Sequence, residues 1–169
     1  MQTQRRIGRL EMSDNLAKRI DRLESIEAIK KLKHVYMNYC DLGYPPDMLG
    51  PLFADDAVWT GKEFGHHPGR RAIEAHFRGI SARIVFAAHL AMNSIIEVDG
   101  DSGTGKWRIL MPCTFVEEGK RVSRWLLGDY VEEYVRIDGA WLFKKMDFVV
   151  NFNVPFDQSW AESAVVRSS

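Results

Sequence analysis

The stretch that decides the fold runs from residue 122 to residue 152 and reads VSRWLLGDYVEEYVRIDGAWLFKKMDFVVNF. It holds two long runs rich in aromatic and β-branched residues, and the pair Asp138-Gly139 separates them. Such runs favour strands, and an Asp-Gly pair between two of them favours a tight hairpin turn. The stretch therefore predicts two long antiparallel strands, at 122–137 and 141–152.

The sequence upstream of this hairpin has the same character. Runs of strand-forming residues at 84–98 and 104–116 are bounded by turn-forming segments at 99–103 and 117–120. Strand runs separated by short turns favour pairing of each strand with the next along the chain. Together with the hairpin at 122–152, they predict an antiparallel meander of four long strands.

The first half of the chain has the periodicity of helices instead. From residue 15 to residue 41 apolar residues recur every three or four positions, which predicts an amphipathic helix, and Gly43 to Pro46 end it. A second amphipathic helix is predicted at 70–80, after a short helical piece at 48–53, a strand at 57–60 and a loop at 61–69.

Helices that precede strands, without alternation between the two, predict an α+β fold in which helices cover one face of the sheet. Strands of this length bend, so we expect a cone-shaped α+β barrel: a curved antiparallel sheet wrapped around the amino-terminal helices, with an enclosed pocket. We predict a single domain over 1–169, with a core at about 15–152. The tail at 153–169 is expected either to cap the pocket or to fray.

Composition argues against several classes of partner. Lysine plus arginine and aspartate plus glutamate both number 23, and no basic stripe lies on the predicted elements, so no nucleic-acid partner is expected. Two cysteines, Cys40 and Cys113, predict neither a disulfide framework nor a metal site and fit a reducing compartment. No apolar run approaches the length of a membrane span and no signal sequence is evident. We therefore predict a cytoplasmic protein without a membrane partner.

Motifs for common cofactors do not occur in the sequence. It contains neither a dinucleotide-binding G-x-G-x-x-G after a strand, nor a phosphate-binding loop, nor a G-x-S-x-G nucleophile elbow. The adjacent pair His66-His67 has no third ligand at a metal-binding spacing. The prediction is a site that uses no cofactor and no metal.

His89 is the histidine with the most informative surroundings. In a strand over 88–96, alternation places it on one face with Ala91, Asn93 and Ile95, and both faces of that strand are largely apolar. An enclosed histidine is expected. It is either a core residue with satisfied hydrogen bonds or a general base, and the second interpretation needs a partner.

Asp41 and Tyr36 are the candidate partners. Asp41 ends the first helix, where it either bonds the backbone of the following turn or accepts a proton from one imidazole nitrogen of His89, leaving the other nitrogen free as a base. Tyr36 lies about one helical turn earlier, as a structural tyrosine or as a hydrogen-bond donor in the site.

Beyond these residues, the chain resembles SnoaL-like members of the nuclear-transport-factor-two superfold, near the branch of lindane dehydrochlorinase, bile-acid dehydratase and scytalone dehydratase. The resemblance covers about residues 23–152. It rests on four stretches: 26–41 with IEAIKKL at its start, FADDAVW at 53–59, His89 with Asn93 after it, and GDYVEEYVRIDGAWLF at 128–143.

The resemblance implies roles for these residues. In that branch a histidine on the first long strand, oriented by an aspartate at the end of the first helix, removes a proton next to the leaving group, and His89 and Asp41 match those positions. Tyr36 falls where the bile-acid enzyme has a tyrosine. The related lindane and bile-acid enzymes are trimers, so a homo-oligomer is expected, a trimer or else a dimer.

This chain departs from the family where a charged or polar group would assist the leaving group. Val149 and Val150 occupy one such stretch, and Met111-Pro112-Cys113 occupies another. Departure of an anionic leaving group therefore lacks an evident helper. Arg136 is a possible substitute, although an arginine at a hairpin end is more often at the surface.

We therefore predict a cofactor-independent lyase, a dehydratase or a related elimination enzyme, that acts on a hydrophobic cyclic or aromatic small molecule. His89 is the expected base, Asp41 its orienting carboxylate and Tyr36 a hydrogen-bond donor. Substrate-contacting candidates are Trp59, Asn93, Met111, Cys113 and Asn151. Two alternatives stay open: a formaldehyde-releasing retro-aldol lyase or isomerase acting on lignin-type aromatics, and a non-catalytic small-molecule-binding domain.

Overall fold

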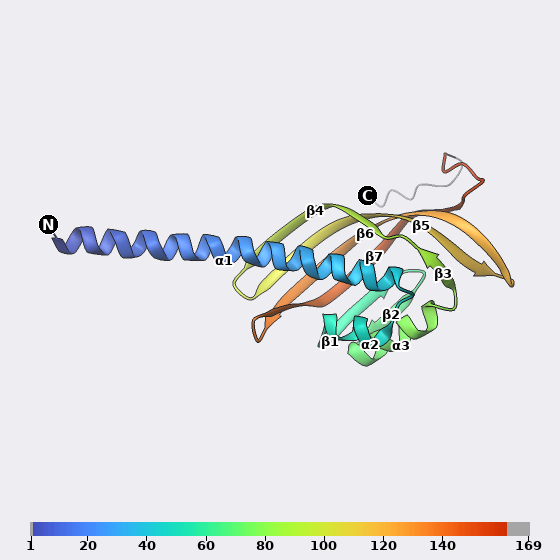
Figure 1. Ribbon diagram of the computed structural model, residues 1–169, viewed down its shortest axis with the longest axis horizontal. Coiled ribbons are helices and arrows are strands. Elements are labelled where there is room, and N and C mark those ends of the chain that lie inside the picture. Colours follow the sequence, from blue (N-terminus) through green and yellow to red (C-terminus); the bar gives the residue numbers. More distant parts are fainter. Residues whose placement is uncertain (1, 162–169) are drawn as a thin grey trace.

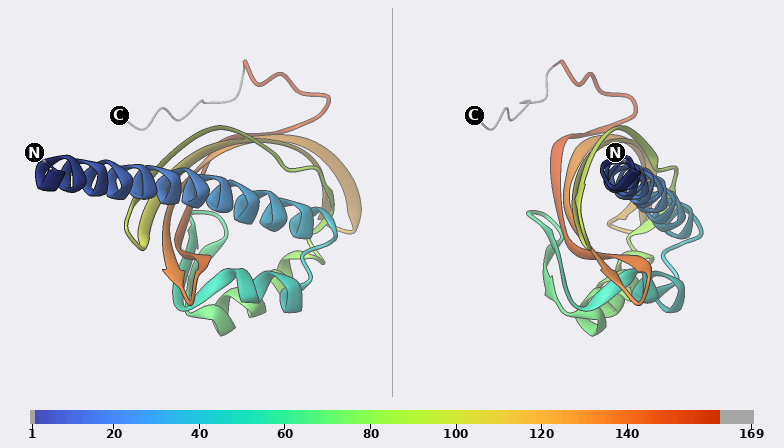
Figure 2. Two further views of the ribbon diagram at one scale, coloured as in Figure 1. Left: turned by 60° about the vertical axis from the view of Figure 1, so that its left-hand side comes forward. Right: turned by 90° about the vertical axis from the view of Figure 1, so that its left-hand side faces the viewer.

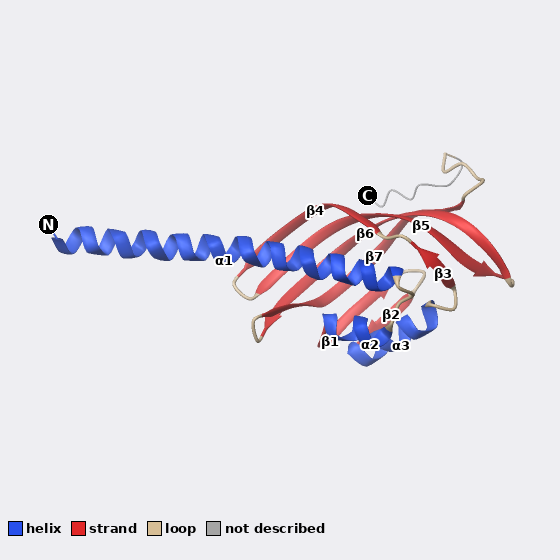
Figure 3. Ribbon diagram, in the orientation of Figure 1, coloured by secondary structure: helices blue, strands red, loops and turns tan. Residues whose placement is uncertain are grey.

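The computed structural model describes residues 2–161 of the chain. Three α-helices and a 3-10 turn precede or interrupt a sheet of seven strands (Figures 1 and 3). The helical elements are α1 Gln2–Asp41, α2 Pro46–Leu49, η1 Gly50–Leu52 and α3 Arg70–Ile80. The strands are β1 Phe53–Gly61, β2 Gly65–Pro68, β3 Ile84–Ala87, β4 Leu90–Asp99, β5 Ser102–Glu117, β6 Lys120–Ile137 and β7 Ala140–Pro155.

The sheet has the order β2-β1-β7-β6-β5-β3, and β4 also pairs with β5. It curves around the carboxy-terminal half of α1, while α2 and α3 close its lower end (Figure 1). This arrangement confirms the predicted α+β fold with a curved sheet wrapped around amino-terminal helices. The expectation of a wholly antiparallel sheet is wrong at one edge, where β1 pairs with β7 in parallel. These strands are far apart in sequence, so no hairpin fixes their relative direction.

The strand-and-turn pattern of the carboxy-terminal half is confirmed. β5, β6 and β7 pair in sequence order, and Asp138-Gly139 turns the last hairpin. Both turn residues have positive φ, 50° at Asp138 and 79° at Gly139. Those angles belong to the tight turns whose twist matches that of paired strands.

The predicted strand at 84–98 is wrong in one respect, because it is two strands. β3 ends at Ala87 and β4 begins at Leu90, so His89 lies in the short gap between them. β4 is itself irregular: its pairing with β5 shifts between Met92 and Ile95, and Asn93 has a φ of 54°. A positive φ at Asn93 breaks the alternation on which the prediction for that residue rested. The loop predicted at 61–69 likewise contains β2, which pairs with β1.

The core lies between the sheet and one face of α1. Ile29, Leu32, Tyr36 and Cys40 follow one another three or four positions apart, and these residues and Met37 are all buried. Full burial of an apolar side chain of this size contributes roughly 1.5–3 kcal/mol. α1 is therefore held by its second half, and its first half extends past the sheet (Figure 2).

A buried ion pair lies within this core, which the sequence did not reveal. The Lys33 and Glu132 side chains are both fully buried and bonded to each other. Glu132 also accepts a hydrogen bond from the Tyr134 hydroxyl, and that hydroxyl accepts one from Trp107 Nε1 at 2.9 Å. Burial lowers the pKa of Lys33, and the Glu132 carboxylate opposes that effect.

No helix over residues 2–161 is both long and apolar enough to cross a membrane. Of the predicted tail, residues 153–155 belong to β7, Phe156 stacks on Trp125, and Trp160 stacks on Phe152. Residues 156–161 do not line the pocket described below, and residues 162–169 lie outside the described part of the chain.

Candidate active site

His89 and Asp41, far apart in sequence, lie in direct contact. The His89 Nδ1 atom is 2.6 Å from Asp41 Oδ1, and the same carboxylate accepts the His89 backbone N–H at 3.0 Å. α1 ends at Asp41 and β4 begins just after His89, so two element ends bring the pair together. The His89 side chain is only 5% exposed, whereas that of Asp41 is 34% exposed.

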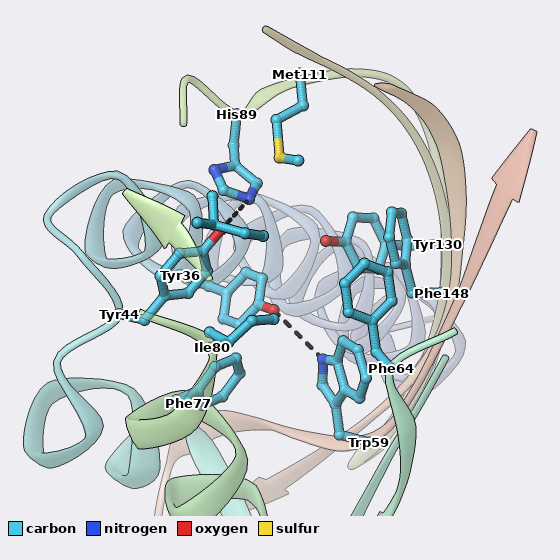
Figure 4. Close-up of a pocket in the computed structure, with 11 residues that line it drawn as sticks. Tyr36, Tyr44, Trp59, Phe64, Phe77, Ile80, His89, Met111, Tyr130 and Phe148 are labelled. Carbon is cyan, nitrogen blue, oxygen red and sulfur yellow. Dashed lines mark hydrogen bonds between the residues drawn. The ribbon is translucent and has the colours of Figure 1, made fainter. Parts of the chain in front are cut away.

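This contact determines where the imidazole proton lies. A carboxylate can only accept hydrogen bonds, so Nδ1 donates to Asp41 and, in the neutral ring, Nε2 carries a free lone pair. Nε2 points toward the Tyr44 hydroxyl at 3.4 Å (Figure 4). That separation is long for an O–H···N bond, so this hydrogen bond is weak.

Nε2 faces a hollow whose walls are almost entirely apolar and aromatic (Figure 4). Its lining residues are Tyr36, Tyr44, Trp59, Phe64, Phe77, Ile80, Ile84, His89, Met111, Tyr130 and Phe148. The hollow has a volume of about 30 Å³, which is room for about one or two water molecules rather than for an aromatic ring. No lysine or arginine is among these lining residues.

The polar atoms around the hollow are neutral hydrogen-bonding groups. Trp59 Nε1 donates to the Tyr36 hydroxyl at 3.4 Å, and the Tyr130 hydroxyl points toward the same space (Figure 4). Burial raises the pKa of Tyr36, Tyr44 and Tyr130 well above the usual tyrosine value. All three hydroxyls therefore stay protonated near neutral pH and can donate a hydrogen bond.

The structure brings together five of the eight residues predicted for the site. His89 and Asp41 touch, and Tyr36, Trp59 and Met111 line the hollow with His89. Whether these residues act in catalysis remains a prediction.

Three predicted wall residues lie elsewhere. Asn93 is exposed on β4, because the irregularity there turns it away from the direction that regular alternation gives. Cys113 is buried with its sulfur 3.7 Å from the Arg124 carbonyl oxygen, and Asn151 donates to Asp129 at 2.7 Å. Arg136, considered as a substitute for the missing cation, instead pairs with Asp21 and Asp101 outside the hollow.

Two tyrosines of the hollow were missed by the sequence analysis. Tyr44 follows the end of α1 with a φ of 60° and was interpreted as part of the helix-breaking turn. Tyr130 lies on β6, and strand alternation alone does not distinguish a pocket-facing tyrosine from a core tyrosine. The only available signal was the position of Tyr44 three residues after Asp41.

The remaining histidines do not join this pair. His34 and His66 are exposed, and His67 stacks on His76 with ring centroids 4.1 Å apart. Burial, with His67 and Arg83 adding to it, lowers the pKa of His76 to about 4. Its Nε2 is buried without a hydrogen-bond partner. Across the described residues, no group of three or more His, Cys, Asp and Glu side chains is placed to hold a metal ion.

A second cavity lies beside the hollow. It has a volume of about 270 Å³ and is lined by Phe64, Ala75, His76, Gly79, Ile80 and Arg83. Phe64 and Ile80 line both spaces, which are therefore neighbours.

Known structures resemble this one over most of its length. A hexachlorocyclohexane dehydrochlorinase, LinA-type3 from Novosphingobium barchaimii LL02, is 27% identical with a TM-score of 0.73, covering 83% of this chain and 95% of that chain. A provisionally named scytalone dehydratase from Novosphingobium aromaticivorans DSM 12444 is 22% identical with a TM-score of 0.71, over 81% and 91% of the two chains. An NTF2-like protein with a cystatin-like fold from Novosphingobium aromaticivorans is 24% identical with a TM-score of 0.62, over 91% and 96%. At 22% and 24% identity the last two show the fold alone.

No curated protein matches this sequence. The model of the SnoaL-like domain matches residues 21–147, which span the end of α1 that packs on the sheet, the His89–Asp41 pair and most of the sheet. The chain therefore belongs to the SnoaL-like domain family, whose structural neighbours include lyases.

Proposed function

We propose that the protein is a lyase that eliminates water from a hydrophobic cyclic or aromatic small molecule, with His89 as the general base and without a cofactor. The observation that carries this proposal is the free Nε2 of His89, which faces an apolar hollow while Asp41 holds the opposite nitrogen. Likeness to a dehydrochlorinase supports an elimination reaction for this chain as well.

Asp41 supports the base in two ways. Its carboxylate fixes the tautomer by accepting the Nδ1 proton, and its negative charge stabilises the imidazolium that forms when Nε2 takes a proton from carbon. The second hydrogen bond, from the His89 backbone, holds the carboxylate in place. General-base catalysis of this kind contributes roughly 100- to 10,000-fold in rate.

The hydrogen-bond donors around the hollow favour an oxygen leaving group. A departing halide or other anion is best stabilised by a cation, and no lysine or arginine lines this space. A hydroxyl group needs a proton instead, and the tyrosine hydroxyls can supply one. In this elimination, His89 takes a proton from a substrate carbon. The electron pair of that C–H bond becomes the C=C double bond, and the neighbouring C–O bond breaks. The oxygen takes a proton from a tyrosine and leaves as water.

Tyr44 is the tyrosine best placed for this role. Its hydroxyl lies beside Nε2, so the proton that His89 gains can return to Tyr44 directly and restore the site. Tyr36 and Tyr130 are further donors, oriented toward the same space (Figure 4).

A ring-sized substrate needs more space than the hollow offers. Rotation of Ile80 and Phe64, the two shared wall residues, would join the hollow to the cavity beside His76. The joined space reaches the lower end of the roughly 300–1,000 Å³ typical of ligand pockets. This volume fits a substrate of one ring with small substituents.

The test is turnover of a panel of hydroxylated, halogenated and lignin-derived ring compounds by EDTA-treated protein. We expect loss of water from a hydroxylated substrate, with at least a 100-fold lower kcat in His89→Ala and in Asp41→Asn. His66→Ala is the matched control, because His66 is an exposed histidine outside the hollow, and it should retain wild-type activity.

Three other outcomes would contradict or change this proposal. Activity that survives both substitutions contradicts the pair as the catalytic centre. Release of formaldehyde indicates retro-aldol cleavage by the same base. A wild type that binds panel compounds without turning them over indicates a binding domain.

A further inference from the structure

The amino-terminal half of α1 projects past the sheet (Figure 2). α1 has 40 residues, about 60 Å of helix, and every residue from 14 to 24 is exposed. Isolated helical segments gain little stability from their own hydrogen bonds and depend on a packed apolar face. The uncovered segment 14–24 therefore calls for a partner.

One side of this segment carries an apolar stripe. Leu16, Ile20 and Leu23 are separated by four and three residues, and they are 53%, 46% and 64% exposed. At 100° per residue they lie on the side of α1 opposite to Ile29 and Tyr36, which face the sheet. The stripe cannot be covered by the protein's own sheet.

Over one heptad, the stripe has the spacing of a coiled-coil seam. Leu16, Ile20 and Leu23 occupy successive d, a and d positions of a heptad. Ile at a with Leu at d favours two parallel strands over larger assemblies. This residue choice points to a second copy of the same helix as the partner.

The charged residues beside the stripe favour a parallel orientation of the two helices. Arg19 takes a g position and Glu24 the following e position, and neither forms an ion pair within the described part of the chain. In a parallel pair, g of one helix faces the following e of the other, so Arg19 meets Glu24 twice. In an antiparallel pair like positions face each other, and arginine would meet arginine.

We propose that two copies of this protein associate through a parallel helix pair formed by the stripe Leu16, Ile20 and Leu23. Because the stripe faces away from the sheet, the two barrels lie on opposite outer sides of the paired helices. This inference does not depend on the proposed lyase activity.

The first test is the mass of the full chain in solution across a concentration series. We expect a dimer in light scattering, and at least a tenfold weaker dissociation constant for Ile20→Glu, because a carboxylate replaces a seam side chain. Asn38→Glu adds the same charge at an exposed position of α1 away from the stripe and should leave the mass unchanged. A monomer at every concentration, a trimer, or an undisturbed Ile20→Glu dimer would overturn the proposal.

A second test resolves the orientation. Arg19→Glu and Glu24→Arg should each weaken the dimer, and the double exchange should restore it, since a parallel pair then regains both ion pairs. In an antiparallel pair the single exchanges keep like charges together and change little. Leu16→Cys should also form a disulfide-linked dimer under oxidation, which an antiparallel pair centred near Ile20 would not allow.

Discussion

At the residue scale, the His89–Asp41 contact depends on a gap between two strands. His89 lies outside regular strand pairing, so its backbone N–H is free to donate to Asp41 while its ring does the same. A histidine inside an ordinary antiparallel ladder would be more constrained, because the ladder takes every second backbone N–H of an edge strand and every one of an inner strand. The break after Ala87 thus explains how one carboxylate receives two hydrogen bonds from one residue.

Tyr44→Phe tests the hydroxyl beside Nε2. We expect kcat to fall roughly 10- to 100-fold on a hydroxylated substrate, the loss of one hydrogen bond of about 1.5–3 kcal/mol to a developing charge. Phenylalanine preserves the stack on Phe77, so the melting temperature should stay close to that of the wild type. Steady-state kinetics on Tyr44→Phe and on Tyr39→Phe, whose ring is not in the hollow, provide the comparison. Equal rates in wild type and Tyr44→Phe would contradict the role of Tyr44.

His76 provides a prediction about pH and stability. Its pKa is about 4 in the folded chain and near 6.5 when unfolded, so between these values the unfolded chain binds the extra proton. His76 therefore makes the protein less stable as pH falls from about 6.5 to 4, with no further loss from this residue below that range. We expect His76→Phe to gain about 1–2 kcal/mol over the wild type across this range, after allowance for the partly exposed ring.

Urea unfolding of wild type and His76→Phe at pH 7.5 and pH 4.5 measures this effect. The difference between the two proteins should grow at the lower pH, because only the wild type has a titrating ring at this position. A difference that is the same at both pH values would show that the ring titrates normally in the folded chain.

At the scale of elements, the Lys33–Glu132 pair joins α1 to β6 through the core. The Lys33 ammonium also lies 3.4 Å from the centroid of the Tyr130 ring, so it contacts the back of a residue that lines the hollow. Removing one member of a buried pair leaves an uncompensated charge, which costs more than the pair contributes. The packing of α1 on the sheet is therefore expected to depend strongly on keeping both members of this pair.

Lys33→Met should lower the free energy of unfolding by about 3–5 kcal/mol. The double variant Lys33→Met with Glu132→Gln should recover a large part of that loss, because glutamine is neutral and still accepts the Tyr134 hydrogen bond. Denaturant titration of the three proteins checks this. If the double variant is no more stable than Lys33→Met, the loss comes from packing rather than from the unpaired carboxylate.

At the scale of the whole molecule, the chain consists of a barrel and a projecting helix. Residues 14–24 are exposed, whereas Asp21 pairs with Arg136 at the point where α1 reaches the sheet. The family match also begins at residue 21. A chain that starts at Asp21 should therefore fold as one unit, which also tests the predicted single domain.

We expect the 21–169 chain to unfold in one cooperative transition at low protein concentration, within a few degrees of the full chain. Its melting temperature should not depend on concentration, whereas that of the full chain should rise with concentration, because association through α1 stabilises the folded state. Calorimetry at two concentrations measures both quantities. Loss of the folded state in 21–169 would show that the projecting segment is needed by the barrel itself.

The sequence determined the class of fold and predicted one contact between residues far apart in the chain. The period of three to four in α1, the long strand runs and the Asp138-Gly139 turn are local signals, since each depends on residues close together in the chain. His89 and Asp41 were identified as partners partly from an enclosed strand context and partly from family resemblance, and the structure places them in contact.

Only the tertiary structure decided which residues surround His89 and Asp41. The wall of the hollow combines residues of α1, α3, β1, β3, β5, β6 and β7. Which residues belong to it depends on where the sheet bends and where β4 loses regular alternation, as at Asn93. Tyr44, the Lys33–Glu132 pair and the parallel pairing of β1 with β7 were equally beyond local patterns. The physical reason is that local sequence fixes which way a side chain alternates, whereas its burial and its partners depend on segments far away in the chain.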